Sequence, residues 1–204
     1  MSLYDRYVLP RLLASVMQQG LFTPFRARIG ADARGQVLEL GIGSGLNLPF
    51  YSPQVTGVTG VDPSAALLRM AGEAGKNAGI NLHLRQSPAE ILAFDAASFD
   101  TVVSTWTMCT IGDPVAALRE ARRVLRPGGR LLFAEHGLSP DAGVARWQHR
   151  ITPVWRHVAG NCHANRAITT ILTDAGFAVD RLETGYVKGP KPLAYMYAGS
   201  ARAA

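Results

Sequence analysis

The chain has 204 residues, a formal net charge of +6 and 48% hydrophobic residues. This length suits one domain around one core, and the composition is that of a soluble globular protein. No apolar run reaches the ~18–20 residues that span a bilayer, and the N-terminus lacks the order of a signal peptide, so we expect a cytoplasmic protein.

The N-terminal part of the chain predicts helices. Residues 2–19 carry apolar side chains at helical spacing, and Pro10 should kink or divide this helix. A second, short helix is expected over 24–29, with Thr23 as its N-cap and Pro24 in its first position.

The rest of the chain alternates strands and helices. Strands are expected at 36–40, 55–61, 81–85, 99–104, 130–135, 177–183 and 194–199. Helices are expected at 65–77, 114–125 and 165–176, and the insertion 138–163 is irregular or helical. This alternation predicts an α/β fold with a mainly parallel sheet covered on both faces. Because the last helix is followed by two consecutive strands, one strand near the edge should be antiparallel.

A glycine-rich turn follows the first predicted strand. Gly41, Gly43 and Gly45 alternate there, Glu39 precedes them, and Asp62 follows about twenty residues later. Glycine lacks a Cβ and tolerates positive φ, so such a turn can approach a nucleotide-like ligand closely. An acid at the end of the second strand suits ribose hydroxyls. The spacing is not the dinucleotide fingerprint G-x-G-x-x-G, and a carboxylate before the turn suits a cationic ligand better than a diphosphate.

This turn with its preceding acid resembles motif I of the class I S-adenosylmethionine-dependent methyltransferases. Phe99-Asp100 and the turn 125–129 (Leu-Arg-Pro-Gly-Gly) repeat the rest of that pattern within 36–135. The resemblance implies one Rossmann-like domain over 1–204, with a seven-stranded, mainly parallel sheet whose last strand is antiparallel. It also implies S-adenosyl-L-methionine as the cofactor.

The resemblance assigns roles to individual residues. The methionine part of the cofactor falls to Glu39 and the glycine turn, the ribose to Asp62, and the adenine side to Pro63. Pro88 stands where many members have an acid, so that adenine contact must come from elsewhere. The implied cofactor-binding residues are Glu39, Gly41, Gly43, Gly45, Asp62, Pro63, Ala89, Glu90, Ser104 and Thr105.

The acceptor of the methyl group must be inferred from the insertion. Four of the five histidines lie between His136 and His163. Because histidine can accept a proton near neutral pH, we predict His136, directly after the fifth strand, as the catalytic residue. Structural or surface roles for these histidines stay open. Cys109 and Cys162 are far apart, and the His and Cys spacings match no familiar zinc pattern, so we expect no metal site.

A narrower resemblance rests mainly on the C-terminal half, with one further stretch after the glycine turn. The pattern is similar to that of the animal microsomal thiol methyltransferases and their bacterial relatives, in Asn47-x-Pro-x-Tyr51, Glu135-His136, Trp147, Trp155, Gly160-Asn-Cys162, Arg166 and Ala175-Gly-Phe177. It implies a small, fairly hydrophobic thiol as acceptor. A phospholipid amine or a quinone-ring carbon is the alternative acceptor. A binding module that has lost catalysis is disfavoured by the intact glycine turn with Asp62.

Three further expectations concern partners. Residues 1–30 form a helical lid over the cofactor cleft, with contact to a membrane surface through this segment as the alternative. The basic residues are scattered, and 104–108 lacks the Asn/Asp-Pro-Pro-aromatic motif of many nucleic-acid methyltransferases, so we expect no nucleic-acid partner. The oligomeric state is left open.

Overall fold

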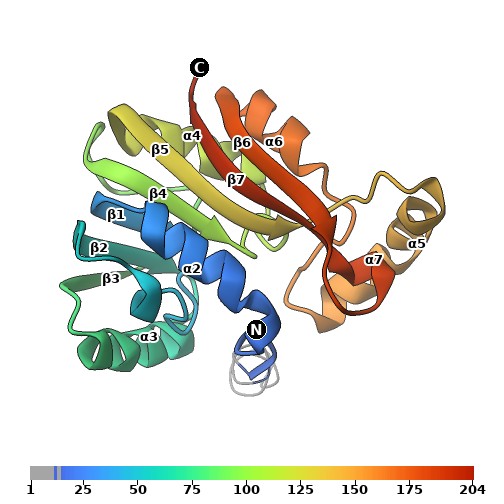
Figure 1. Cartoon of the computed structure of the whole chain (residues 1–204), viewed down its shortest axis with the longest axis horizontal. Coiled ribbons are helices and arrows are strands. Elements are labelled where there is room, and N and C mark those ends of the chain that lie inside the picture. Colours follow the sequence, from blue (N-terminus) through green and yellow to red (C-terminus); the bar gives the residue numbers. More distant parts are fainter. Residues whose placement is uncertain (1–11, 13–14) are drawn as a thin grey trace.

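A seven-stranded sheet runs through the molecule (Figure 1). The computed structural model describes Leu12 and residues 15–204. The sheet order is β3-β2-β1-β4-β5-β7-β6. Its strands are β1 (Gly35–Leu40), β2 (Val55–Asp62), β3 (Leu82–Gln86), β4 (Phe99–Thr105), β5 (Leu125–His136), β6 (Phe177–Tyr186) and β7 (Tyr195–Ala203).

The pairing confirms the predicted seven-stranded, mainly parallel Rossmann-like sheet with an antiparallel last strand. β1 pairs in parallel with β2 and β4, and β2–β3 and β4–β5 are parallel as well. Only β7 is reversed, because it pairs in antiparallel register with both β5 and β6. The carboxyl ends of the parallel strands therefore meet at one edge of the sheet, where open α/β sheets bind ligands.

Helices cover both faces of the sheet (Figure 1). The α-helices are α2 (Thr23–Asp32), α3 (Ala65–Ala78), α4 (Pro114–Val124), α5 (Ala142–Val158), α6 (Ile168–Asp174) and α7 (Lys191–Ala194), with 3₁₀ turns η2 (Gly20–Phe22) and η3 (Leu48–Phe50). The hydroxyl of Ser64 caps α3 by accepting from the Leu67 amide at 3.3 Å. The Asp113 carboxylate likewise caps α4 by accepting from the Ala116 amide at 2.9 Å.

Several local predictions need correction. Thr23 is not a cap: it is the first residue of α2, and its amide bonds to Gly20 in the preceding 3₁₀ turn. The predicted turn 126–129 lies inside the bounds of β5, but these residues skip the pairing with β4, whose register passes from Leu125 to Arg130, and Gly128 takes the expected positive φ of +79°. The short helix α7 was not predicted, and most of the predicted helix 2–19 lies outside the described residues.

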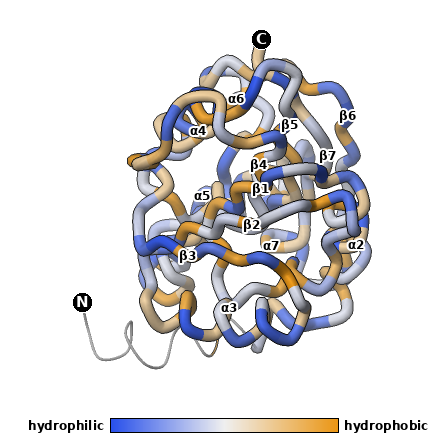
Figure 2. Tube along the Cα trace, turned by 90° about the vertical axis from the view of Figure 1, so that its left-hand side faces the viewer, coloured by the Kyte–Doolittle hydropathy of each residue, from blue (hydrophilic) through white to orange (hydrophobic). Residues whose placement is uncertain are grey.

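The core has one apolar cluster on each face of the sheet. Successive residues of a strand point to opposite faces, so Val102 packs with α4 and α6 whereas Val103 packs with α2 and α3. Phe133 and Leu132 of β5 alternate in the same way. Figure 2 shows the hydrophobic stretches of β1, β4 and β5 at the centre of the molecule.

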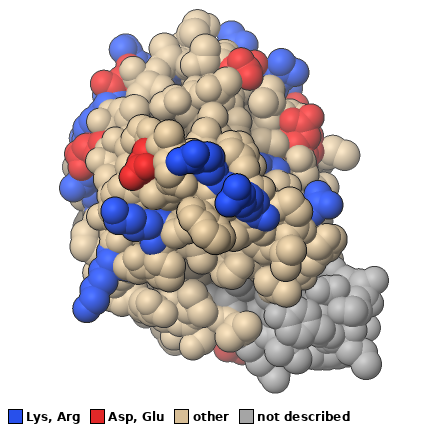
Figure 3. Space-filling model, turned by 90° about the vertical axis from the view of Figure 1, so that its right-hand side faces the viewer, with Lys and Arg blue, Asp and Glu red and all other residues tan. Residues whose placement is uncertain are grey.

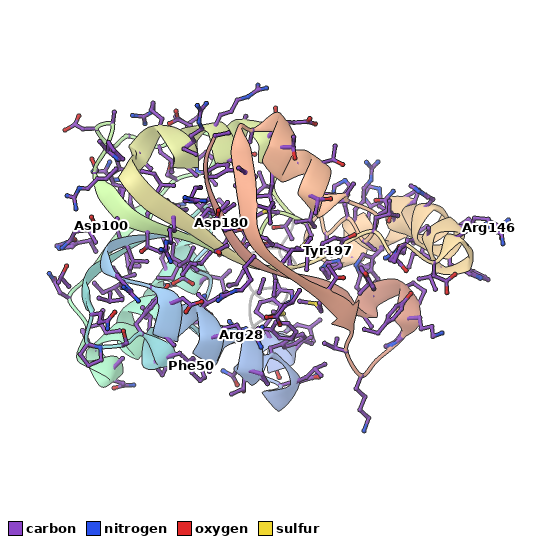
Figure 4. All side chains as sticks on the ribbon, turned by 45° about the horizontal axis from the view of Figure 1, so that its top comes forward. Arg28, Phe50, Asp100, Arg146, Asp180 and Tyr197 are labelled. Carbon is purple, nitrogen blue, oxygen red and sulfur yellow. The ribbon has the colours of Figure 1, made fainter. Side chains whose placement is uncertain are left out.

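The helix α5 projects from the carboxyl ends of the strands. Asp100, at the start of β4, and Arg146, on α5, lie at opposite ends of the molecule (Figure 4). The face that carries α5 shows many Lys and Arg side chains (Figure 3). Among the described residues, none of the helices has the length and apolar character needed to cross a membrane.

Candidate active site

A buried carboxylate stands at the end of β1. Glu39 is 1% exposed. Its two oxygens accept hydrogen bonds from Asn47 Nδ2 at 2.7 Å and from the Tyr51 hydroxyl at 2.8 Å. Asn47 also donates to Thr105 Oγ1 at 2.9 Å and accepts from Arg26 Nη1 at 2.9 Å. A connected polar network therefore links α2, the segment after the glycine turn, and the ends of β1 and β4.

Burial dominates the electrostatics of Glu39. It raises the pKa of this carboxyl to about 7, against the opposing effect of the Tyr51 and Asn47 hydrogen bonds and the charge of Arg26. The cost of ionising a buried acid falls when a cation binds beside it. Glu39 is therefore poised to ionise when a positively charged group arrives.

The glycine turn and Asp62 are locked together. Asp62 Oδ2 accepts from the Gly43 amide at 3.0 Å, and Oδ1 accepts from the Ser64 amide at 2.8 Å. Burial raises the pKa of Asp62, and these two amides work against that rise. Since each carboxylate oxygen has a second lone pair, Asp62 keeps acceptor capacity for ligand hydroxyls.

The turn leaves room for a ligand at one glycine. Gly41, Gly43 and Gly45 all have positive φ, between 56° and 81°. A Cβ on Gly41 would lie 2.5 Å from Thr107 Cγ2, but a Cβ on Gly43 would meet nothing nearer than 3.9 Å. Open space beside Gly43, a carboxylate suited to an ammonium group and another suited to ribose hydroxyls fit the cofactor that the resemblance implies.

The end of β4 carries the predicted Ser104 and Thr105, which point to different partners. Thr105 belongs to the Glu39 network, whereas the Ser104 hydroxyl donates to Glu135 Oε1 at 2.8 Å. Glu135 is fully buried, and burial raises its pKa to about 7 despite the Thr107, Ser104 and Met108 hydrogen bonds. Its other oxygen, Oε2, finds no hydrogen-bond partner among the described residues.

Trp106 forms an aromatic wall beside these carboxylates. Its backbone takes φ +50°, which is rare for a bulky residue. Phe22 packs edge-on at 4.8 Å between ring centroids, Phe25 at 6.1 Å, and the Arg26 guanidinium lies 4.8 Å from the indole. The indole Nε1 is buried and lacks a partner in the described part of the chain. Such a donor in an aromatic wall can meet a polar ligand atom.

The other predicted cofactor residues lie in different surroundings. Pro63 is exposed beyond the end of β2. Ala89 packs into the core. Glu90 accepts from the Gly112 and Asp113 amides at 3.1 and 3.2 Å, so its carboxylate holds the loop before α4.

A thiol–imidazole cluster lies at the ends of β4 and β5. His136 is 9% exposed, and its Nε2 lies 3.3 Å from Cys162 Sγ. Cys162 follows α5, and Trp155 Nε1 donates to its sulfur at 3.3 Å. Cys109 completes the cluster after β4. The fold thus brings the predicted His136 together with two cysteines from distant parts of the sequence.

The two thiols differ in acidity. Hydrogen bonding with Cys109 holds the pKa of Cys162 well below the ordinary thiol value, and His136 acts in the same direction against burial. The same hydrogen bond, with burial, raises the pKa of Cys109. Burial opposes protonation of His136, but its contact with Cys162 and the charge of Glu135 together outweigh burial and raise its pKa. Of the two thiols, Cys162 is therefore the one that carries negative charge.

The site contains residues that sequence reasoning did not assign to it. Asn47 and Tyr51 stood out only as part of the narrower resemblance, and their hydrogen bonds to Glu39 are a finding of the structure. No sequence motif marked Arg26 or Trp106 as part of the site, because their contacts depend on how α2 packs on the sheet. Glu135 stood beside His136 in the sequence, but only the structure shows its unpartnered oxygen.

Comparison with known proteins bears on what this site does. A family described as "Methyltransferase domain" matches residues 38–133. Human thiol S-methyltransferase TMT1B is 34% identical over 186 residues, covering 88% of this chain and 73% of the relative. Phosphatidylethanolamine N-methyltransferase of Cereibacter sphaeroides is 39% identical over 152 residues, covering 73% of each chain. A solved geranyl diphosphate methyltransferase superposes with a TM-score of 0.72 at 16% identity, over 95% of this chain and 89% of the other.

Proposed function

The chain belongs to the class I S-adenosylmethionine-dependent methyltransferases, and on that premise we propose that it methylates the sulfur of a small, fairly hydrophobic thiol. The observation that carries this proposal is the length of the similarity to human TMT1B, which covers 88% of the chain. The general methyltransferase match ends at residue 133. The thiol-methyltransferase similarity therefore extends into the region that forms the acceptor side, after β5.

The chain's own residues would hold the cofactor as the geometry suggests. Glu39 would pair with its ammonium group, the turn around Gly43 would hold its amino-acid part, and Asp62 would accept from its ribose hydroxyls. The bound cofactor supplies a methyl group on a sulfonium, which a nucleophile can take in line.

On the acceptor side, the protein's task is alignment and exclusion of water. The aromatic wall of Trp106, Phe22 and Phe25 suits a lipophilic acceptor. His136 is our candidate for the group that receives the acceptor's proton. Because its Nε2 already contacts Cys162, that proton would enter a thiol–imidazole pair and not an isolated imidazole.

A labelled-methyl screen tests the acceptor. The protein is incubated with methyl-labelled S-adenosylmethionine and, in separate reactions, with small alkyl and aryl thiols, phosphatidylethanolamine vesicles and quinols. The Asp62→Ala variant is the matched control for cofactor-dependent transfer. We expect label on the thiol sulfur. Transfer to lipid or quinol without transfer to any thiol would overturn the proposal.

A phospholipid amine is the second candidate acceptor. It is favoured by the 39% identity to the bacterial phosphatidylethanolamine enzyme, the higher of the two identities, although over a shorter stretch. Peripheral contact with a membrane surface through the N-terminal segment remains a prediction, because part of that segment, residues 1–11, 13 and 14, lies outside the described residues. Vesicle co-sedimentation together with label in the lipid would support this candidate.

A further inference from the structure

Three soft-metal ligands converge beside the acceptor side of the site. One ligand atom each from Cys109, His136 and Cys162 lies within 4.8 Å of the other two, and the His136–Cys162 pair is at 3.3 Å. Zinc binds thiolate sulfur at about 2.3 Å and imidazole nitrogen at about 2.0–2.1 Å, so ligand atoms in a tetrahedral site lie about 3.5–3.8 Å apart. To hold such an ion, no pair of ligand atoms needs to approach by more than about 1 Å, and the His136–Cys162 pair needs to separate slightly.

The ligands come from three separate parts of the chain, each held in place. His136 ends β5 and pairs in register with Met196 of β7. The Cys109 carbonyl accepts from the His163 amide at 2.8 Å, which ties the segment after β4 to the loop after α5. Cys162 lies in that loop and accepts from Trp155 Nε1. Hydrogen bonds of this kind around metal ligands orient them and increase affinity.

The three ligand residues differ in burial. Cys109 and His136 are buried, at 2% and 9% exposure, whereas Cys162 is half-buried. Two charged residues lie near the cluster. Arg166 donates to the Met108 and Ile111 carbonyls, and Glu135 is the residue directly before His136. Two thiolates neutralise a divalent ion, so the metal-bound cluster would add no net charge among these groups.

We propose that Cys109, His136 and Cys162 form a binding site for one zinc ion with an open fourth position. Three protein ligands including two cysteines and a histidine are the ligand count of a catalytic zinc site, whose fourth position holds water or substrate. The long sequence separations of these residues gave no metal motif, and only the fold brings them together.

The open position would take the acceptor thiol, an extension that rests on the proposed function. On binding, the thiol S–H bond breaks, its proton leaves to solvent, and a sulfur–zinc bond replaces the bond from zinc to water. A coordinating thiol is deprotonated outright, so the acceptor is presented as a thiolate, the nucleophilic form. With zinc bound, His136 would act as a metal ligand, and the proton-acceptor role proposed for it above applies to the metal-free protein.

Metal analysis and cobalt substitution test the site without any turnover. The full-length protein is purified under reducing conditions, freed of metal with a chelator, and titrated with Zn²⁺ and with Co²⁺. We expect one ion per chain and the charge-transfer absorption of cobalt–thiolate bonds. Cys109→Ser, Cys162→Ser and His136→Ala should each weaken zinc binding by more than about a hundredfold, since they remove ligands and not merely their surroundings.

A matched control separates the cluster from other histidines. His157→Ala removes an exposed histidine of α5 and should leave metal binding unchanged. Retained binding of the demethylated cofactor product shows that each variant is folded. The site would be overturned if the reduced wild type bound less than one zinc ion per chain. It would also be overturned if His157→Ala lost zinc binding as much as the ligand variants do, or if a Cys109–Cys162 disulfide persisted under reduction.

A second measurement addresses the open position alone. A small alkyl thiol added to the cobalt-loaded protein, without S-adenosylmethionine, should strengthen the thiolate charge-transfer band. An unchanged spectrum would refute the thiol extension while the metal result stands on its own. Metal binding with a thiol-induced band but no methyl transfer to thiols would instead refute the proposed function and leave the zinc site intact.

Discussion

The raised pKa of Glu39 gives this residue a contribution of its own to the pH dependence of the protein's stability. A shift from the ordinary 4.5 to about 7, caused chiefly by burial, corresponds to about 3 kcal/mol. Because the folded pKa lies above the unfolded one, the folded state binds more protons between pH 4.5 and 7. The free energy of unfolding therefore falls as pH rises through this window, and the loss is complete above pH 7.

Glu39→Gln isolates this effect. Glutamine can keep both hydrogen bonds, because its carbonyl can accept from Asn47 and the Tyr51 hydroxyl can act as acceptor as well as donor. We expect the ligand-free variant and the wild type to have similar stability at pH 5. At pH 8 the variant should be more stable by about 3 kcal/mol. At the same pH it should bind S-adenosylmethionine more weakly, since it lacks the charge that pairs with the ammonium group.

Urea denaturation at several pH values between 5 and 8 provides the measurement, with wild type and variant treated in parallel. The difference between the two proteins removes the contribution of every other titrating group. A wild-type-minus-variant difference that stays constant across this range would refute the burial argument for Glu39. Calorimetry adds an independent check: near pH 6, cofactor binding should release a proton from the wild type and not from the variant.

Three further substitutions test the rest of the site. Asp62→Ala should weaken cofactor binding by about 1.5–3 kcal/mol, measured by calorimetry, and unchanged affinity in a folded variant would remove the ribose assignment. Gly41→Ala places a Cβ 2.5 Å from Thr107, whereas Gly79→Ala meets nothing within 4 Å at a similar positive φ. Gly41→Ala should therefore lower the melting temperature more than Gly79→Ala, by the equivalent of about 1–3 kcal/mol. Equal effects would mean that the Thr107 side chain moves aside without a loss of stability. His136→Ala should keep cofactor affinity and lose turnover, and full turnover would make His136 structural.

Local signals predicted most of the elements, and they were wrong where a neighbouring element intervened. Ser64 and Asp113 themselves have extended backbone conformation, so their side chains cap the helices as expected. Thr23 has the same chemistry but follows a 3₁₀ turn that runs directly into α2, and the helix has no side-chain cap. The four residues of α7 are too few to show an apolar period.

The candidate site divides in the same way between short-range and long-range contacts. Glu39, the glycine turn and Asp62 lie within one strand–turn–strand unit, whose motif is visible in the sequence. Arg26 reaches this unit from a helix on the face of the sheet, and Cys162 reaches His136 through the docking of the loop after α5. Neither contact has a periodicity or spacing that a single sequence displays, because both depend on tertiary packing.

The reversed strand β7 has a consequence for how the chain acquires its structure during synthesis. β7 is the last strand, yet it lies between β5 and β6, and within the described residues β6 pairs with no other strand. Until β7 has left the ribosome, β5 therefore presents an unpaired edge and β6 has no place in the sheet. The nascent chain can assemble β1 to β5 early, but the ordering of His136 beside Met196 must wait for the final strand. The cofactor side can thus form before β7 emerges, while the acceptor side is completed only once β7 has joined the sheet.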